Sequence, residues 1–574
     1  MKFKKFRIIT ILFLLSLFLN VFGFWWGLPN YYSWSVDDMT PHMPLMLIKN
    51  NLKGDYIYPT FHFVLSGVVY SPYLAYLYLT EGLILEGPYE NRLSYFTDPL
   101  SSLTIFMAIS RLISAIMGSL AVVFVYFGVK TLYGKKAALF SALIVSFSYI
   151  IILFAHLGNL DVPYMLWFSI ALYAYAKLLK TYKTKYYVLL GVFTVLAVST
   201  KDLIMAAFVF LPIPLLYFHL KHHLKKLSFK AALFNKKLAY CLFAVLVTFL
   251  LSNNILIDFS GFKYRYACDF CVGSKEHMSG MAAIMGFPDT FLGQIQLFQE
   301  TLFKLKESVG IILFFLLLIG LFYCIYRFDY RVFAFLPLLI SYYVFSIARI
   351  NFVYWRYTIP MIIILSFFAG KFLSDLLENV KSKKIIYPII FLIFTHAFLY
   401  GFSADLSLVY DSRYSAEKWM LENIDKDAKI EIYMDERSLP RFHALGYNDV
   451  SRVSFSWNLT EKLPVLLFNP IVDPPDLESL KIRDPDYIIL PGCCYRSLEY
   501  ALSSDGLEKK EIGTKIMRES KGKEEKKDYL SLLLSEKAGY KVVQVFNNQI
   551  PFAPKFPFKF KRENVPVIIL KKDG

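Results

Sequence analysis

Long apolar stretches fill most of the first 403 residues and limit the chain to a small set of folds. Inside a bilayer every backbone N–H and C=O group must be bonded within the protein, so membrane spans are helices or closed barrels. Stretches of about 20 apolar residues match the length that a helix needs to cross the hydrocarbon core. The stretches to be considered lie near 8–26, 61–85, 103–128, 137–155, 162–179, 186–199, 203–218, 238–257, 308–326, 332–348, 354–374 and 385–403.

The composition supports a membrane protein. Of the 574 residues, 56% are hydrophobic, 18% are aromatic and only 19% are charged, whereas soluble proteins carry about 25% charged residues. The 54 Phe and 41 Tyr residues are typical of lipid-facing helices with aromatic belts at the interfaces. The composition excludes a soluble enzyme, a disordered regulator and a nucleic-acid-binding protein, in spite of a net charge of +17. We expect a polytopic α-helical membrane protein.

Basic residues predict the orientation of the spans. Lysines and an arginine precede the first stretch, which ends in Trp25-Trp26 and is interpreted as an uncleaved anchor with a cytoplasmic N-terminus. Short loops rich in Lys and Arg face the cytoplasm in most membrane proteins. Such loops lie near 130–136, 177–185, 221–237, 327–331 and 371–384, each after an apolar stretch.

This orientation requires that the stretch 61–85 does not cross the membrane. Residues 27–102 contain more acidic than basic side chains, and we interpret them as one long external loop with interfacial helices. About 11 spans then alternate through a transmembrane module, residues 1–403. Residues 404–574 remain outside as an extracytoplasmic α/β domain, with strands expected near Lys429–Tyr433, Asp486–Leu490, Tyr540–Phe546 and Pro566–Leu570.

Charged residues gather at the predicted external ends of the spans, where charges are costly and call for a reason. Carboxylates can take a proton from a hydroxyl group, and cations can bind a lipid phosphate. Adjacent carboxylates also raise each other's proton affinity, which helps a general base near neutral pH. The candidates are Asp37, Asp38, His156, Asp161, Lys201, Asp202, Arg349 and Arg356.

Each candidate also has a purely structural interpretation. The Asp37–Asp38 pair would be solvated in a loop, and Asp161 would cap the following helix. Lys201 and Asp202 would form a local neutral pair, and Arg356 would extend to the interface. Cys268 and Cys271 form a CxxC that favours a disulfide or free thiols over a metal site.

Short motifs occur along the chain in a fixed order. Together they resemble a GT-C membrane glycosyltransferase of the dolichyl-phosphate-mannose–protein mannosyltransferase type, or its aminoarabinose-transferring relatives. The resemblance covers residues 1–435, although Asp202 stands where the family's Thr-Lys-Gly turn has Gly. The motifs are Asp37-Asp38, Arg111-Leu, Leu132-Tyr-Gly-Lys-Lys136, His156-Leu-Gly-Asn, Asp161-Val-Pro163, Thr200-Lys201-Asp202, Arg356-Tyr-Thr-Ile-Pro360 and Asp411-Ser-Arg-Tyr-Ser-Ala-Glu-Lys-Trp419.

The resemblance implies an inverting enzyme that moves a monosaccharide from a polyprenyl phosphate to a hydroxyl group of a lipid, protein or glycan on the extracytoplasmic face. It implies that Asp37 is the catalytic base and Asp38 its support, while Asp161 shapes the acceptor or metal site. Lys201 and Arg356 would bind the donor phosphate. The accessory residues would be His42, His156 and Tyr357.

No cofactor is required by this reading, but it allows a divalent metal at Asp37, Asp38, His42 and Asp161. Membrane lipids are expected partners, and nucleic acid is not. A transporter or flippase of a lipid-linked or anionic solute is the alternative, and it predicts charges in the middle of helices. A non-catalytic scaffold for surface-glycan assembly is a further alternative. No Trp-Trp-Asp-Tyr-Gly motif occurs, which argues against block transfer of a glycan to asparagine.

Overall fold

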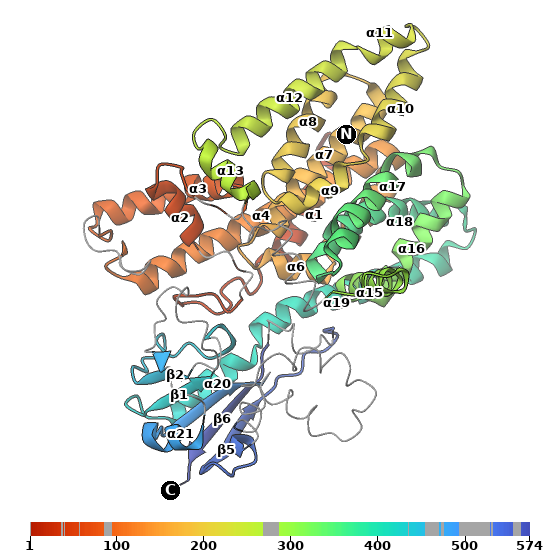
Figure 1. The fold of residues 1–574 in the computed structure, drawn as a ribbon. Coiled ribbons are helices and arrows are strands. Elements are labelled where there is room, and N and C mark those ends of the chain that lie inside the picture. The colour runs from red at the N-terminus through yellow and green to blue at the C-terminus, as the bar shows by residue number, and fades with distance from the viewer. Residues whose placement is uncertain are drawn as a thin grey trace. The chain divides into compact units, whose positions relative to one another are not determined.

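The computed structural model forms two compact units, which we call the helical unit and the C-terminal unit (Figure 1). The helical unit comprises Met1–Phe24, Pro41–Pro72 and Ala108–Asp405, and the C-terminal unit comprises Trp25–Thr40, Tyr73–Met107 and Leu406–Gly574. The structure describes residues 2–35, 38, 41–54, 56, 58–84, 95–267, 286–433, 436–453, 470–471, 476–492, 529, 532–554 and 564–573.

Helices make up nearly all of the helical unit, and α3, α4 and α19 continue from it into the C-terminal unit. The helices are α1 (Lys2–Val21), α2 (His42–Lys49), α3 (Phe61–Leu79), α4 (Pro99–Tyr133), α5 (Lys135–Ser146), α6 (Tyr149–Ala155), α7 (Asp161–Thr181), α8 (Thr184–Val198), η2 (Asp202–Ile204), α9 (Met205–Phe208), α10 (Pro212–His223), α11 (Phe229–Leu233), α12 (Lys236–Ser252), α13 (Phe259–Ala267), α15 (Phe291–Val309), α16 (Ile311–Tyr326), α17 (Tyr330–Tyr342), η3 (Tyr343–Ala348), η4 (Trp355–Thr358), α18 (Ile359–Asn379) and α19 (Lys383–Val409).

The lengths and hydropathy of these helices confirm the expected fold class, a polytopic α-helical membrane protein. Within the described residues, 7 helices are long and apolar enough to cross a membrane, or up to 9 if each of two bent pairs is one span. The bent pairs are α5 with α6 and α15 with α16, and two shorter apolar helices cover Arg7–Val21 and Thr184–Val198. Helix α3, in the stretch expected to lie at the interface, is not one of these spans.

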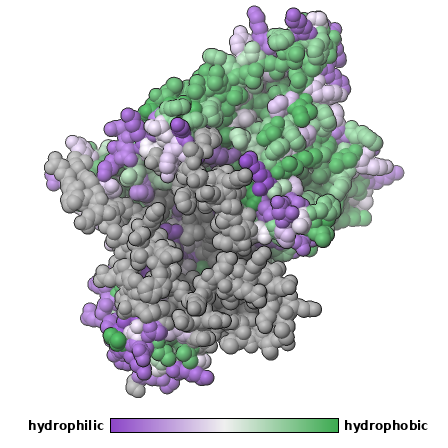
Figure 2. Space-filling view, in the orientation of Figure 1, coloured by the Kyte–Doolittle hydropathy of each residue, from purple (hydrophilic) through white to green (hydrophobic). Residues whose placement is uncertain are grey.

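On the face seen in Figure 2, apolar side chains make up much of the surface of the helical unit. The clearest case is the span Phe229–Ser252, in which only 6% of the apolar window is buried inside the protein. Leu242 and Phe243 on α12 are 69% and 66% exposed. Side chains of this kind are stable in lipid rather than in water, so α12 presents its surface to the bilayer.

Two helices form the buried centre of the helical unit. The span Asp161–Thr181 is 83% buried within its apolar window, and Trp355–Asn379 is 78% buried. Helix α7 packs against α8, and α18 packs against both α5 and α16. Gly320 of α16 allows a close approach, since a Cβ atom there would lie 2.5 Å from the backbone nitrogen of Ala369. The middle of α18 therefore packs closely against α16.

The C-terminal unit contains a six-stranded mixed sheet in the order β3-β2-β1-β4-β6-β5. Strand β1 is parallel to β2 and β4, and β2 is parallel to β3, whereas β6 is antiparallel to β4 and β5. The elements are α20 (Ser412–Asn423), β1 (Ile430–Tyr433), η5 (Glu436–Ser438), β2 (Val450–Val453), β3 (Pro470–Ile471), α21 (Leu477–Arg483), β4 (Tyr487–Pro491), β5 (Tyr540–Phe546) and β6 (Val567–Lys572).

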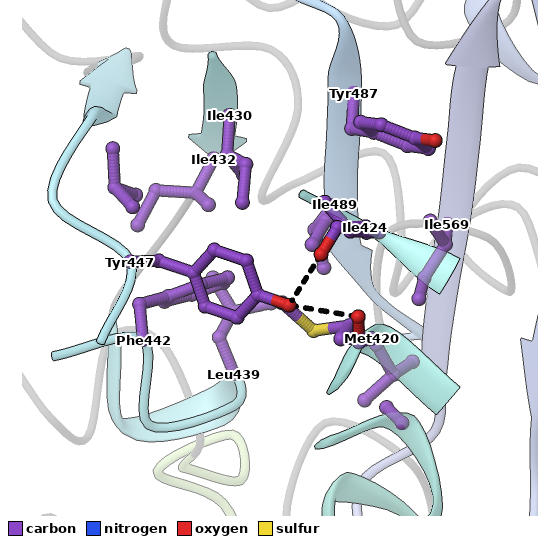
Figure 3. Close-up of a cluster of buried hydrophobic side chains, with 13 residues drawn as sticks. Met420, Ile424, Ile430, Ile432, Leu439, Phe442, Tyr447, Tyr487, Ile489 and Ile569 are labelled. Atoms are coloured by element: carbon purple, nitrogen blue, oxygen red, sulfur yellow. Dashed lines mark hydrogen bonds between the residues drawn. The ribbon is translucent and has the colours of Figure 1, made fainter. Parts of the chain in front are cut away.

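Alternating side chains of the central strands point into two apolar clusters. Ile430 and Ile432 of β1 pack in a cluster with Met420 of α20, while Tyr433 belongs to a second cluster with Leu480 of α21. The hydroxyl of Tyr447 donates to the carbonyl oxygens of Met420 and Ile424, at 2.7 and 3.2 Å (Figure 3). This contact fixes the end of α20 against the sheet.

The expected α/β character of the tail is confirmed, and the four predicted strands correspond to β1, β4, β5 and β6. Strands β2 and β3 were not predicted. The tail does not form its unit alone, because Trp25–Thr40 and Tyr73–Met107 belong to the same compact unit. The expected division at residue 403 stays a prediction; in the grouping above the helical unit ends at Asp405.

Candidate active site

A buried ion pair joins the beginning of α7 to the turn that follows α8. Asp161 is the first residue of α7, and its backbone nitrogen donates to Oδ1 of Asn159 at 2.9 Å. Lys201 follows α8, and its Nζ atom lies 2.5 Å from Oδ1 of Asp161. The two side chains are only 8% and 4% exposed for Lys201 and Asp161, respectively. Removing two charges from water is costly, so this pair indicates a site rather than a surface contact.

Arg356 approaches the same carboxylate from a third element. Its Nε atom lies 3.8 Å from Oδ2 of Asp161. The guanidinium is flanked by aromatic rings, with Cζ 4.7 Å from the ring centroid of Tyr354 and 5.8 Å from that of Tyr357. The short helix η4 is held in place because Thr358 donates to the hydroxyl of Ser308 at 2.9 Å. Arg356 is therefore directed by packing as well as by charge.

Each of these three residues stands at the beginning of a membrane span. The spans are Asp161–Thr181, Asp202–His223, which Lys201 precedes, and Trp355–Asn379. Helix N-termini present unbonded N–H groups and a partial positive charge, which favours anions. The three spans thus bring their positive ends and two cationic side chains to one place.

Tyr58, which the sequence did not indicate, lies within electrostatic range of this site. Burial raises the pKa of Tyr58, Arg356 lowers it, and both Asp161 and Asp202 raise it, so the phenol senses all three charges. Arg265 on α13 lies within electrostatic range of Asp202. The Nη2 atom of Arg265 donates to Oδ1 of Asn253 at 2.9 Å. Tyr58 lies in the connection between α2 and α3, which carries no hydropathy pattern.

The charges of this cluster suit a phosphate ligand. Two basic side chains, Lys201 and Arg356, approach one carboxylate, Asp161, so a ligand with one negative charge would balance them. Burial lowers the pKa of Lys201 to about 8, Asp161 opposes this effect, and Arg356 reinforces it. The amine is therefore still mostly protonated at neutral pH and can donate to a phosphate oxygen.

The geometry of Asp161 does not suit a metal ion. Its Oδ1 atom contacts the ammonium of Lys201 and its Oδ2 atom faces Arg356, so a metal cation there would meet two positive groups at close range. Among the described residues, no group of three or more His, Cys, Asp and Glu side chains is arranged to hold a metal. Asp161 is therefore assigned no metal-binding role.

The predicted residues Asp38, His42 and His156 belong to different parts of the chain from the elements that carry Asp161, Lys201 and Arg356. Asp37 is outside the described residues, and Asp38 belongs to the C-terminal unit, where its Oδ2 atom accepts from Ser33 at 2.7 Å. His42 begins α2. His156 contacts the carbonyl oxygens of Ile152 and Phe22, both at 2.9 Å, and lies 3.5 Å from a carboxylate oxygen of Asp405.

Two structural alternatives raised by the sequence are not observed. The position before α7 is occupied by Leu160, and Asp161 makes no side-chain cap. Lys201 pairs with Asp161 rather than with its neighbour Asp202. Cys268 and Cys271 lie outside the described residues. Lys201 thus pairs with the first residue of α7 and not with a residue of its own turn.

Comparison with known proteins supports the resemblance seen in the sequence. Residues 103–255 match the family model described as dolichyl-phosphate-mannose-protein mannosyltransferase. This segment contains Asp161 and Lys201, and the match agrees with the expected class of enzyme, a GT-C glycosyltransferase. No curated protein matches the chain.

Several solved structures of membrane glycosyltransferases are similar to the chain. The oligosaccharyltransferase AglB from Archaeoglobus fulgidus, in complex with an inhibitory peptide and a dolichol-phosphate, is 14% identical, with a TM-score of 0.43 over 88% of this chain and 71% of that chain. ArnT from Cupriavidus metallidurans, bound to undecaprenyl phosphate, is 12% identical, with a TM-score of 0.40 over 87% and 95%. The S. cerevisiae O-mannosyltransferase complex Pmt1–Pmt2, bound to the sugar donor, is 20% identical, with a TM-score of 0.33 over 44% and 34%.

Proposed function

We propose, from the premise that residues 103–255 belong with the mannosyltransferase family they match, that the chain is an integral-membrane inverting glycosyltransferase. It transfers a monosaccharide from a polyprenyl-phosphate donor to a hydroxyl group on a lipid, protein or glycan acceptor. The observation that carries the proposal is the convergence of Lys201 and Arg356 on Asp161 at the beginnings of three spans.

In this proposal the cationic cluster binds the donor phosphate. A polyprenyl-phosphate sugar is a phosphodiester with one negative charge, which matches the surplus positive charge of the cluster. Lys201 and Arg356 donate to the phosphate oxygens, and Asp161 keeps both side chains directed at the site. As the bond from the anomeric carbon to the phosphate oxygen breaks, its electron pair passes to the phosphate, where the two cations stabilise the developing charge.

The acidic pair supplies the base. Asp37 takes the proton of the acceptor hydroxyl while the oxygen attacks the anomeric carbon opposite the leaving phosphate, and the configuration inverts. Asp38 supports this carboxylate. The new glycosidic bond replaces the sugar–phosphate bond, the proton ends on Asp37, and polyprenyl phosphate leaves.

The membrane side of the reaction follows from the same spans. All three helices run away from the cluster, so their beginnings lie on one side of the bilayer. The opposite ends of α7 and α10 carry Lys180, Lys221 and their basic neighbours, which supports a cytoplasmic location for those ends. The reaction and the C-terminal unit would then be extracytoplasmic, with the N-terminus inside.

The position of the charges distinguishes this enzyme from a transporter. A pathway for an anionic solute would require charges along the middle of the spans. In the cluster, Asp161, Lys201 and Arg356 stand at span ends, which favours chemistry at one membrane face.

The test is sugar transfer by the purified chain in nanodiscs. The donors are C55 polyprenyl phosphates carrying labelled mannose, glucose, galactose or N-acetylglucosamine, and mixed membrane extract supplies acceptors. We expect one donor to be consumed by the wild type and not by Asp37→Asn. The matched control is Asp98→Asn, because Asp98 is an exposed acid that bonds to the nitrogen of Ser101, and Asn serves equally well at a helix start.

Equal transfer by the wild type and Asp37→Asn would remove Asp37 as the base. Movement of labelled donor across a vesicle membrane without any glycosylated product would show that the chain is a transporter and not a glycosyltransferase. Absence of both transfer and movement with every donor, in protein that keeps its thermal transition, would overturn the proposed function.

A further inference from the structure

The segment from Asp411 to Trp419 is one of the motifs that resemble the glycosyltransferase family. The proposed reaction gives it no role. In the structure it lies at the start of α20 in the C-terminal unit, which also contains residues 25–40. The indole Nε1 of Trp26 donates to Oδ2 of Asp411 at 3.0 Å, and the backbone nitrogen of Gly27 donates to the hydroxyl of Tyr414 at 2.9 Å. The beginning of the acidic loop is therefore bonded directly to α20.

Arg413 is the centre of this contact. Its guanidinium makes two bonds to Asp411, at 2.9 and 2.7 Å, and neither side chain has any exposed surface. Cζ of Arg413 lies 4.1 Å from the ring centroid of Trp34 and 5.2 Å from that of Trp26. Its Nη1 atom reaches the carbonyl oxygen of Trp34 at 3.5 Å. A desolvated guanidinium over indole rings is among the stronger cation–π arrangements.

A second arginine holds the same loop from the next connection. Arg441 pairs with Glu417 of α20 at 2.6 Å and also donates to the carbonyl oxygen of Leu28. Its Cζ atom lies 5.3 Å from the ring centroid of Trp34. Trp34 thus lies between two arginines. Arg413 is paired with Asp411, which directly precedes α20, and Arg441 is paired with Glu417 of α20. We call Trp26, Trp34, Asp411, Arg413 and Arg441 the loop clamp.

The clamp is connected to Asp38 through hydrogen bonds of Ser33 and Ser35. Ser33, next to Trp34, donates its hydroxyl proton to Oδ2 of Asp38 at 2.7 Å and accepts from the nitrogen of Ser35 at 3.1 Å. The nitrogen of Asp38 donates to the carbonyl oxygen of Ser35 at 3.2 Å. Asp38 is only 5% exposed. The direction of this carboxylate therefore depends on where Trp34 is held.

We propose that the loop clamp positions the carboxylate of Asp38, the neighbour of Asp37, and that Arg413 is the main positioning residue. The proposal rests on the proposed function for the meaning of Asp37 and Asp38, but its structural part stands separately. Arg413 does not touch the reacting groups in this account. It holds Trp34, and through Ser33 the carboxylate of Asp38, in one position, so that this supporting carboxylate is already oriented when the acceptor arrives.

The chain offers a matched control for the buried pair. Arg483 and Glu431 form another buried pair in the C-terminal unit, at 2.6 Å, with 6% and 0% exposed side chains. Arg483 lies at the end of α21 and its guanidinium contacts Glu431 of β1. The double variants Asp411→Asn/Arg413→Gln and Glu431→Gln/Arg483→Gln remove the same charges and leave no buried ion without its partner. Arg413→Lys is the conservative variant.

Hydrogen exchange and kinetics are measured on the full-length variants in nanodiscs. We expect the Asp411/Arg413 variant to exchange the amides of residues 27–35 at least tenfold faster than the wild type, while the Glu431/Arg483 variant leaves them unchanged. With the donor that the wild type consumes, kcat should fall at least tenfold in the Asp411/Arg413 variant. Affinity for C55 polyprenyl phosphate should stay within twofold, because Lys201 and Arg356 are untouched. Arg413→Lys should recover part of kcat.

Each result decides the matter. Unchanged exchange in 27–35 would overturn the clamp, and faster exchange with unchanged kcat would overturn its positioning role. Equal loss of kcat in both double variants would mean a general loss of stability and also overturn it. If the wild type transfers no sugar while only the Asp411/Arg413 variant loosens the loop, the glycosyltransferase fails and the clamp stands.

Discussion

Asp161 and Lys201 are 40 positions apart in the chain, yet Oδ1 of the first lies 2.5 Å from Nζ of the second. The contact is possible because α7 and α8 form a hairpin whose outer ends meet. Both residues are nearly inaccessible to solvent. The pair is the foundation of the proposed phosphate site, and its energetics can be tested directly.

Breaking this pair should destabilise the helical unit. In Lys201→Met the carboxylate of Asp161 keeps only the more distant Arg356, so we expect a loss of about 3–5 kcal/mol. Asp161→Asn/Lys201→Met should recover most of that loss, since both charges are gone. The measurement is equilibrium unfolding in detergent micelles. Lys136→Met is the control, because Lys136 pairs with Glu378 while 57% exposed, and a change of about 1 kcal/mol or less is expected.

Donor affinity should depend on the protonation of Lys201. Its pKa of about 8 means that the ammonium is present below pH 8 and is lost as the pH rises through that value. Bound phosphate stabilises the ammonium, so affinity should decline above pH 8 by up to about tenfold per pH unit. The probe is a C55 polyprenyl-phosphate mannose, whose phosphodiester charge is constant between pH 6 and 10. Lys201→Arg should remove the slope, because arginine remains charged; a slope that persists would contradict the assignment.

Arg356 should matter more for its shape than for its charge alone. The guanidinium is flanked by the rings of Tyr354 and Tyr357, and lysine cannot stack or donate in the same way. We expect Arg356→Gln to lower kcat by about 100-fold to 1,000-fold and Arg356→Lys to give an intermediate value. Single-turnover sugar transfer is the measurement. Equal activities for Arg356→Lys and the wild type would reduce the role of Arg356 to charge.

The hydroxyl of Tyr447 should contribute to the stability of the C-terminal unit. It donates to two carbonyl groups at the end of α20, so Tyr447→Phe leaves these buried acceptors without that donor. We expect a loss of about 1–2 kcal/mol, seen as faster hydrogen exchange in α20. Tyr410→Phe is the control, since Tyr410 is 59% exposed, and its exchange pattern should match that of the wild type.

Gly320 should tolerate no side chain. Its Cβ would meet the backbone of Ala369 and Phe368 on α18, and backbone atoms cannot move aside without shifting the helix. Gly320→Ala should lower the unfolding temperature and also weaken donor binding, because α18 follows directly from Arg356. Gly128→Ala faces the end of the Phe367 ring at 3.2 Å, which can turn, and should have a smaller effect on both quantities.

The sequence was sufficient to predict the parts of the structure that follow a repeating physical pattern. Apolar length identified the membrane helices, and strands such as β5 showed the expected polarity. Asp161, Lys201 and Arg356 could be found because charges at span ends are costly and rare. Tyr58 could not be found, because the connection between α2 and α3 has no periodicity and the charges that act on it, Asp161 and Arg356, are distant in the chain. The place of Trp26 and Trp34 in the C-terminal unit likewise depends on contacts with Asp411 and Arg413, which are distant in the chain.

The hairpin of α7 and α8 also has a consequence for biogenesis. The translocon would receive Asp161 and Lys201 within one pair of consecutive helices, so a carboxylate and an ammonium could neutralise each other before either is committed to the lipid. A single charge within or near an inserting helix is costly, and pairing of the two charges lowers that cost. Arg356 is synthesised much later, so the cationic site is complete only after η4 has emerged.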